Sequence, residues 1–270
     1  MRSIRKQLQK LAIVSLLFFA VGCATVPITG RKQMNLFPEG QMISMSLTQY
    51  DQFLKENKVS EDKEQTQLVK NVGHRIAEAV EQYMNEKGLG DRIANFQWEF
   101  NLVESDVPNA WCMPGGKVVF YSGILPYTKT EAGLAVVMGH EIAHAIARHG
   151  NERMSQQMGI QAVGMGLNLA LQEKPKETQN IAMAAFGGVS NLGVILPFSR
   201  THETEADKMG LIFMAMAGYD PAEAVEFWKR MADSGGQKPP EFLSTHPSDE
   251  TRIQNLKAFL PEAMKYYKKK

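Results

Sequence analysis

The chain has 270 residues, 44% of them hydrophobic, which is enough to build one large domain or two small ones. Its 30 lysines and arginines are nearly balanced by 29 acidic residues, which leaves a formal net charge of +1 at pH 7. A nucleic-acid-binding surface needs an excess of positive charge, and after the N-terminal targeting segment the chain has no basic stripe apart from the basic tail over residues 263–270. We therefore exclude nucleic acid as a partner.

The first 22 residues are typical of a targeting signal. Four basic residues precede an apolar run over residues 11–21 that is too short to span a bilayer. The run ends in Ala20-Val21-Gly22-Cys23, which resembles the lipobox of bacterial lipoproteins; an ordinary signal peptide is the alternative. The resemblance implies that residues 1–22 are removed, that Cys23 is acylated, and that the lipid anchors the chain to a membrane. Alanine rather than aspartate follows the cysteine, at Ala24, which resembles the pattern of lipoproteins that are sorted to the outer membrane. We therefore expect the chain to be located at the periplasmic face of the bacterial outer membrane.

Residues 23–60 are expected to form the lipidated tether and a leading segment. Apolar spacing from Gln65 to Met84 then predicts a helix. Alternating apolar residues over Phe96–Val103 predict a half-buried strand, and a Pro-Gly-Gly turn leads to a second strand over residues 117–121. We expect a small sheet here, with a hairpin as one arrangement, just before the next helix.

That helix, expected from about Lys129 to His149, carries the sequence His140-Glu141-Ile142-Ala143-His144. Two histidines four residues apart on a helix project from one face, so both imidazoles can bind one zinc ion. Glu141 lies beside them, where its carboxylate could accept a proton from a zinc-bound water. A catalytic zinc site has three protein ligands and one open position, so a third ligand is required.

Residues 154–197 are rich in methionine, alanine and glycine, and residues 181–197 contain no charge. We favour mobile helices that cover the site, because methionine-rich surfaces repack easily. A membrane-associated segment is the alternative, which the glycines and the marginal length weaken.

The third zinc ligand is expected from a second helix, about sixty residues downstream. Glu203 and Asp207 are four residues apart and share a helical face. Glu205 points elsewhere and is expected to be exposed, so the spacing favours Glu203, and it leaves His202 possible. Further on, Asp220-Pro221-Ala222-Glu223 predicts the start of another helix, and a last helix is expected over residues 248–260.

Taken together, these motifs resemble metallopeptidase family forty-eight, a family of gluzincins, over roughly residues 65–260. The exported lipoprotein members are the most similar. The resemblance rests on separated motifs: Asn109-Ala110 with Pro114-Gly115-Gly116, the pentapeptide at 140–144, Pro197-Phe198-Ser199-Arg200, Glu203 with Asp207, and Thr245-His246-Pro247. It implies a predominantly α-helical α+β fold, in which a zincin-type peptidase domain over residues 61–262 has a small β-sheet beside the active-site helix.

The resemblance also implies one zinc ion per chain, held by His140, His144 and Glu203. Glu141 would be the general base that activates water and then passes the proton to the leaving amine. Asp207 would accept a hydrogen bond from a ligating histidine and fix its ring.

Three further residues receive roles from the resemblance. His246 would lie near the metal, where it either stabilises the oxyanion or occupies the fourth zinc position; a merely structural role is the alternative. Asn109 and Ala110 would border the cleft, where a strand edge pairs with an extended polypeptide substrate.

The expected function is hydrolysis of peptide bonds in misfolded envelope proteins, a role that comes from the resemblance alone. The alternative is an envelope chaperone or assembly factor whose zinc site is latent or plugged. A purely structural zinc site is disfavoured, because such sites usually have four protein ligands and favour cysteine. The sequence leaves the oligomeric state open.

Overall fold

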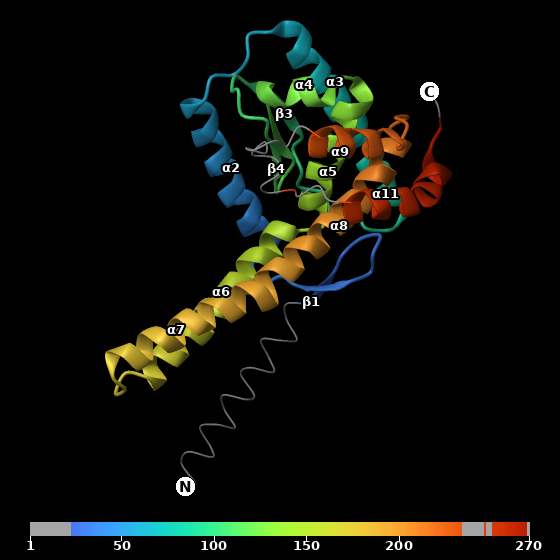
Figure 1. The fold of residues 1–270 in the computed structure, drawn as a ribbon. Coiled ribbons are helices and arrows are strands. Elements are labelled where there is room, and N and C mark those ends of the chain that lie inside the picture. The colour runs from blue at the N-terminus through green and yellow to red at the C-terminus, as the bar shows by residue number, and fades with distance from the viewer. Residues whose placement is uncertain (1–22, 234–245, 247–249, 269–270) are drawn as a thin grey trace. The chain divides into compact units, whose positions relative to one another are not determined.

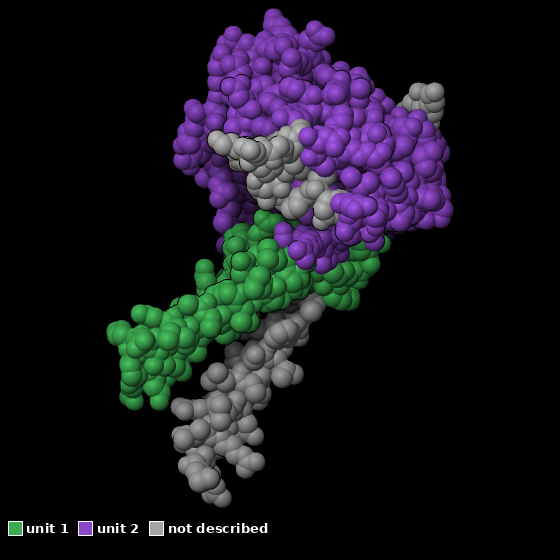
Figure 2. All heavy atoms as spheres, in the orientation of Figure 1, with its two compact units in different colours: residues 1–39, 148–198 green, residues 40–147, 199–270 purple. Residues whose placement is uncertain are grey.

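The computed structural model describes residues 23–233, 246 and 250–268 (Figure 1). The described residues form two compact units, which Figure 2 distinguishes by colour. Unit 1 consists of residues 23–39 and 148–198, and unit 2 contains the rest. The predicted signal peptide, residues 1–22, lies outside the described residues, as do Thr245 and Pro247. Cys23 is the first residue of a strand, and its acylation stays a prediction.

Unit 1 combines a two-stranded ribbon with helices. Strand β1 (Cys23–Thr25) pairs antiparallel with β2 (Lys32–Met34), so that Cys23 lies opposite Met34. Helices α6 (His149–Ala170) and α7 (Lys176–Ser190) contact each other, and a π-helical segment, η3 (Asn191–Ile195), follows α7. The chain then enters α8 (Leu196–Met216), most of which belongs to unit 2.

Polar contacts explain why residues far apart in sequence share unit 1. The backbone N–H of Leu36 donates to Ser155 Oγ at 2.9 Å, and Asn151 Nδ2 donates to the Phe37 carbonyl at 2.7 Å. Arg31 forms an ion pair with the buried Glu152 at 2.6 Å. Residues 23–39 and 148–198 therefore belong to one compact unit. The expected division into a tether and leading segment over 23–60 and a peptidase domain over 61–262 stays a prediction.

Unit 2 has a mainly helical fold around a small sheet. Its helices are α2 (Glu39–Glu56), α3 (Lys63–Glu86), α4 (Leu125–Thr128), α5 (Glu131–Ile146), most of α8, α9 (Glu223–Asp233) and α11 (Glu250–Ala263), with short 3-10 turns η1 (Gly90–Arg92), η2 (Ser122–Ile124) and η4 (Met264–Tyr266). Helix α3, predicted from apolar spacing, starts where Asp62 Oδ1 accepts a hydrogen bond from the Gln65 N–H at 3.0 Å.

Helix α5, which carries the histidine pair, is two residues shorter at its start than expected. Lys129 has a φ of +60°, so the helix begins only after Thr130, whose hydroxyl accepts a hydrogen bond from the Gly133 N–H at 3.0 Å. Arg148 also has a φ of +60°, which separates α5 from α6. Almost every residue of α5 is buried, as its apolar composition predicts.

The sheet has three strands, β3 (Glu99–Val103), β4 (Ala110–Met113) and β5 (Lys117–Tyr121), in the order β3-β5-β4. The hairpin is formed by β4 and β5, and β3 runs parallel to β5. Strand β4, which sequence patterns did not predict because its residues do not alternate clearly, contacts α5. The expected predominantly α-helical α+β class, with a small sheet beside the histidine-bearing helix, is confirmed.

Helices α5 and α8 approach each other closely at two glycines. A Cβ atom at Gly210 would lie 3.0 Å from the backbone nitrogen of His140, and one at Gly139 would lie 3.0 Å from the Gly210 carbonyl oxygen. Backbone atoms cannot move aside as the end of a side chain can. The close approach therefore fixes the separation between the helix that carries the histidines and the helix that carries Glu203.

Replacing Gly210 with Val should lower the free energy of unfolding by about 1–3 kcal/mol, the usual cost of overpacking a tight interior. Denaturant unfolding of the purified chain measures this loss. Gly166→Val, in an open part of α6 where an added Cβ meets nothing within 4 Å, is the matched control for helix propensity. Equal losses in the two variants would mean that the glycine contact contributes nothing to stability.

One helical run in the described part of the chain, Lys176–Met216, is long and apolar enough to cross a membrane by length and composition alone. Its most apolar 18-residue window has a mean hydropathy of 1.7, and none of that window is buried.

Candidate metal and catalytic site

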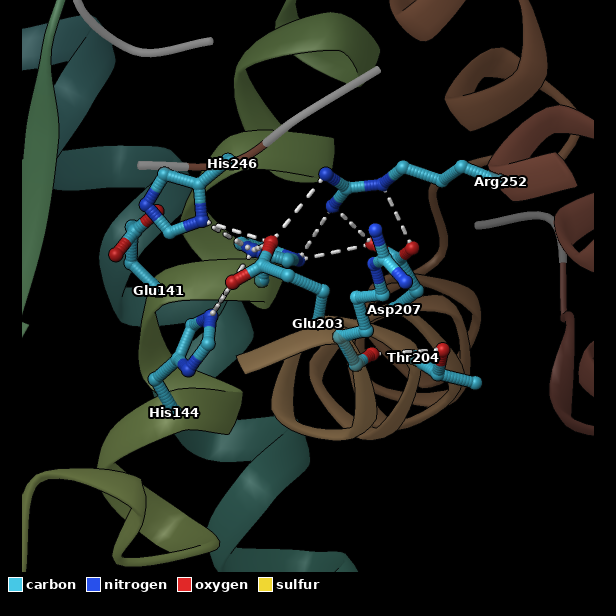
Figure 3. Close-up of polar contacts among 9 residues, drawn as sticks. Glu141, His144, Glu203, Thr204, Asp207, His246 and Arg252 are labelled. Carbon is cyan, nitrogen blue, oxygen red and sulfur yellow. Dashed lines mark hydrogen bonds and ion pairs between the residues drawn. The ribbon is translucent and has the colours of Figure 1, made fainter. Parts of the chain in front are cut away.

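Four side chains converge in unit 2: His140 and His144 from α5, Glu203 from α8, and His246. Figure 3 shows His144, Glu203 and His246 pointing toward one another. Their potential metal-binding atoms all lie within 4.8 Å of one another. The Nε2 atoms of His140 and His144 are 3.1 Å apart, and Glu203 reaches each of them with one carboxylate oxygen at 3.3 Å. These residues could hold a metal ion.

The spacing of these atoms fits a tetrahedral cation. With bonds of about 2.0–2.1 Å, tetrahedral zinc ligands lie roughly 3.3 Å from one another. His246 Nδ1 completes the set, at 3.0 Å from His140 Nε2 and 2.9 Å from Glu203 Oε2. The donor set of imidazoles and one carboxylate is also the set that zinc accepts.

The side chains around Glu203 favour its anionic form, in which its carboxylate can bind a metal ion. Burial alone would favour its neutral acid, but hydrogen bonds with His140 and His144 hold the pKa of Glu203 well below its ordinary value. Burial would also lower the pKa of His140, yet hydrogen bonds with Asp207 and Glu203 raise this pKa to about 9. A metal ion in the same position would compete with that proton for the ring.

Glu141 lies beside the four donors and is 4% exposed. Its Oε1 atom has no hydrogen-bond partner among the described residues, and His246 Nε2 lies 3.5 Å away. Burial raises the pKa of Glu141, although the neighbouring His246 and His140 partly oppose this shift. A buried carboxylate with a raised pKa and an oxygen that forms no hydrogen bond with the described residues can accept a proton from a water molecule placed between it and the donors.

Behind His140, a buried charge network fixes the ring. Asp207 Oδ1 lies 2.9 Å from His140 Nδ1, which leaves Nε2 of the same ring facing the other donors. Arg252 donates to both oxygens of Asp207, at 2.8 and 2.6 Å, and lies 3.3 Å from Glu203 Oε2. Its guanidinium also lies 3.4 Å from the centroid of the Trp228 ring. The burial cost of these charges is offset by this pairing.

Sequence reasoning missed Arg252 and Trp228. Arg252 is 6% exposed, but an arginine in an otherwise polar helix carries no sign that it is buried. The stacking and the bidentate contact become visible only when α8, α9 and α11 are placed together.

The expected exposure of Glu205, which favoured Glu203 as the ligand, was wrong. Glu205 is 4% exposed, and His202 is 1% exposed. Helix α8 is buried on nearly all sides over residues 202–215, so exposure does not separate its carboxylates. Their positions distinguish the possible ligands, because Glu203 belongs to the cluster of donor atoms and neither Glu205 nor His202 does.

The two residues expected beside the cleft lie at the start of β4. Ala110 pairs with Phe120 of β5, and the Asn109 carbonyl accepts a hydrogen bond from the Tyr121 N–H at 3.0 Å. Within the described residues, β4 is an edge strand that pairs with β5 alone. It also contacts α5, which carries the histidine pair.

The fold and this donor set define a metallopeptidase of the zincin type. The chain belongs to peptidase family M48, because residues 70–260 match that family's sequence profile. The expected family is therefore confirmed, and with it the expected class of enzyme, a metallopeptidase.

Several curated proteins are similar to this chain. The chain is 39% identical to the mitochondrial metalloendopeptidase OMA1 of Schizosaccharomyces pombe over 63% of its length, and 30% identical to human OMA1 over 96%. It is 32% identical to the beta-barrel assembly-enhancing protease of Escherichia coli over 65% of its length. The matches span 49%, 50% and 38% of those three relatives, respectively.

The expected location at the periplasmic face of the bacterial outer membrane is contradicted by these comparisons. Relatives from fungi, a plant and animals are mitochondrial proteins by name. The identity to the Schizosaccharomyces pombe protein, 39%, also exceeds the 32% identity to the Escherichia coli protein. The physical reason for the error lies in the first 22 residues. A basic segment without acidic residues is also typical of mitochondrial transit peptides, so this composition does not identify a bacterial export signal.

Proposed function

We propose that this chain is a zinc-dependent endopeptidase that hydrolyses misfolded polypeptides. The main support for the proposal is the group of four donor atoms within 4.8 Å of one another, beside the buried Glu141. In the proposal, one zinc ion per chain is held by His140, His144 and Glu203. When bound, zinc polarises the scissile carbonyl and makes a water molecule more acidic.

The remaining steps are assigned to residues of the chain. Glu141 accepts a proton from the attacking water and then delivers it to the leaving amine. Asp207 keeps the His140 ring in the required tautomer, and Arg252 holds Asp207 in place through its two hydrogen bonds. The edge of β4 binds the substrate in extended form, since backbone pairing reads no particular side chain and suits a broad substrate range.

Digestion of casein by the purified chain tests the proposed function. Activity should be lost when a zinc chelator is added and should return when zinc is restored, with close to one zinc ion bound per chain. Calcium added in place of zinc is the control, because calcium requires six or more oxygen ligands that this site does not offer. Activity that survives complete metal removal would contradict the proposal.

We also propose that His246 occupies the fourth ligand position and thereby blocks the site. Its Nδ1 atom lies 3.0 Å from His140 Nε2 and 2.9 Å from Glu203 Oε2, as close as the other donors lie to one another. The substrate would have to displace this imidazole before the reaction begins.

His246→Ala should therefore raise casein hydrolysis several-fold, because more molecules are competent at any moment. Zinc content should stay unchanged, since three ligands remain. A fall of about 10²–10³ would instead assign His246 to oxyanion stabilisation. Unchanged activity would leave only a structural role.

A further inference from the structure

Unit 1 contains an apolar cavity that the proposed peptidase function does not use. Its volume is about 840 Å³, and it lies among β2, α6, α7 and η3. Hydrocarbon side chains make up most of its wall: Ile160, Val163, Phe186, Val189, Val194 and Phe198. Cavities of this size hold ligands of several hundred daltons in other proteins.

One polar side chain in the wall lacks a partner among the described residues. Gln33 is 3% exposed, and neither its Nε2 nor its Oε1 atom has a hydrogen-bond partner in the described part of the chain. A buried amide without partners is unfavourable, because water no longer compensates it. The cavity therefore suits a ligand that is mostly hydrocarbon but carries a group able to pair with an amide, such as an ester carbonyl.

The cavity continues into exposed apolar surface. Val163 and Val189 line it and yet are 61% and 70% exposed, and Leu192 in η3 is 69% exposed. No residue from Ile181 to Ser199 is charged. A helix of 18 residues is about 27 Å long, close to the hydrocarbon thickness of a bilayer, and the helical run Lys176–Met216 contains an apolar window of that length. Such a surface fits a hydrocarbon phase better than water.

Charge at the rim of the cavity fits a lipid headgroup. Glu152 also lines the cavity, but Arg31 neutralises it through two hydrogen bonds at 2.8 and 2.6 Å. Lys32 is exposed at the rim, where its Nζ donates to Thr25 Oγ1 at 2.9 Å and keeps further N–H groups for a ligand. The positive charge of Lys32 complements a phosphate group.

We propose that this cavity binds an acyl chain of a phospholipid from a membrane. The acyl chain of the lipid lies against the valine, isoleucine and phenylalanine side chains of the cavity. The Gln33 amide donates a hydrogen bond to the ester carbonyl, and Lys32 contacts the phosphate. Exposed Val189 and Leu192 rest in the hydrocarbon layer from which the lipid comes.

The cavity itself can be tested with a cavity-filling variant of the full chain. The probes are monomeric lysophosphatidylcholine, below its micelle concentration, and vesicles of phosphatidylcholine with phosphatidylglycerol. Gly159 lines the cavity, and an added Cβ there meets nothing within 4 Å. Gly159→Phe should weaken lysolipid binding more than tenfold. Gly166→Phe, in the same helix but outside the cavity lining, should bind as the unaltered chain does.

A second variant keeps the test decisive if Gly159→Phe folds poorly. The unaltered chain should bind ester-linked lysolipid roughly fivefold more tightly than its ether-linked analogue, the factor expected from one neutral hydrogen bond. Gln33→Leu should abolish that preference. Equal binding of both lipids by the unaltered chain, or full binding by a folded Gly159→Phe chain, would overturn the proposal.

The source of the acyl chain is decided by Cys23→Ser, which cannot carry a thioether-linked lipid. If the Cys23→Ser variant binds vesicles, and adding Gly159→Phe to it reduces that binding, the membrane is supported as the source of the acyl chain. If the lysolipid enters only the Cys23→Ser chain, the chain's own lipid fills the cavity and a membrane source is wrong. Binding of an apolar peptide in place of lysolipid would likewise overturn the assignment.

Discussion

The Glu141→Gln chain is expected to bind zinc as the unaltered chain does, but to hydrolyse casein at least about a hundredfold more slowly. General acid–base catalysis contributes about 10²–10⁴ to a rate, and an amide cannot accept the proton. The substitution preserves shape and removes no donor from the group formed by His140, His144, Glu203 and His246. Burial raises the pKa of Glu141, which means that the buried charge is unfavourable. Replacing it with a neutral amide should therefore not lower the stability of the fold.

The measurements are zinc per chain and initial rates of casein cleavage on the same preparations. Glu78→Gln is the matched control, since Glu78 is exposed on α3 and the change in charge is the same. Undiminished hydrolysis by Glu141→Gln would rule out Glu141 as the base. If hydrolysis is lost but the protein still protects unfolded chains from aggregation, the chaperone alternative gains support.

Glu203→Ala should weaken zinc binding by more than about a hundredfold. Loss of a partner outside the coordination shell already costs about 10–100-fold in metal affinity, and a ligand should cost more. Without Glu203, the imidazoles of His140, His144 and His246 face Arg252, which lies 3.3 Å from Oε2 of that carboxylate. The local charge then becomes unfavourable for a cation.

Glu205→Ala is the matched control for this experiment. Glu205 lies two residues further along α8, is buried to a similar degree, and lies outside the donor cluster. Zinc per chain, measured after dialysis against a weak chelator, should fall in the first variant and stay near one in the second. Full stoichiometry in Glu203→Ala would mean that a different carboxylate binds the metal.

Local sequence patterns were sufficient for the histidine pair and for several helices, whereas the fold class followed from the resemblance to the family. Residues four apart on a helix must lie on one face, so the relation between His140 and His144 follows from helix geometry alone. The apolar spacing of α3 and the turn chemistry around the β4–β5 hairpin are equally local. The choice of Glu203 followed from the need for a third ligand, although the expected exposure of Glu205 was wrong.

The tertiary structure decided what depends on contacts between distant segments. Arg252 meets Asp207 across 45 residues of sequence, and no local pattern marks either as a partner of the other. The parallel pairing of β3 with β5 and the joining of residues 23–39 to α6 are likewise non-local. Sequence periodicity fixes which side of a helix a residue occupies. Only the packing of helices against one another determines whether that side meets water, a buried charge or an apolar cavity.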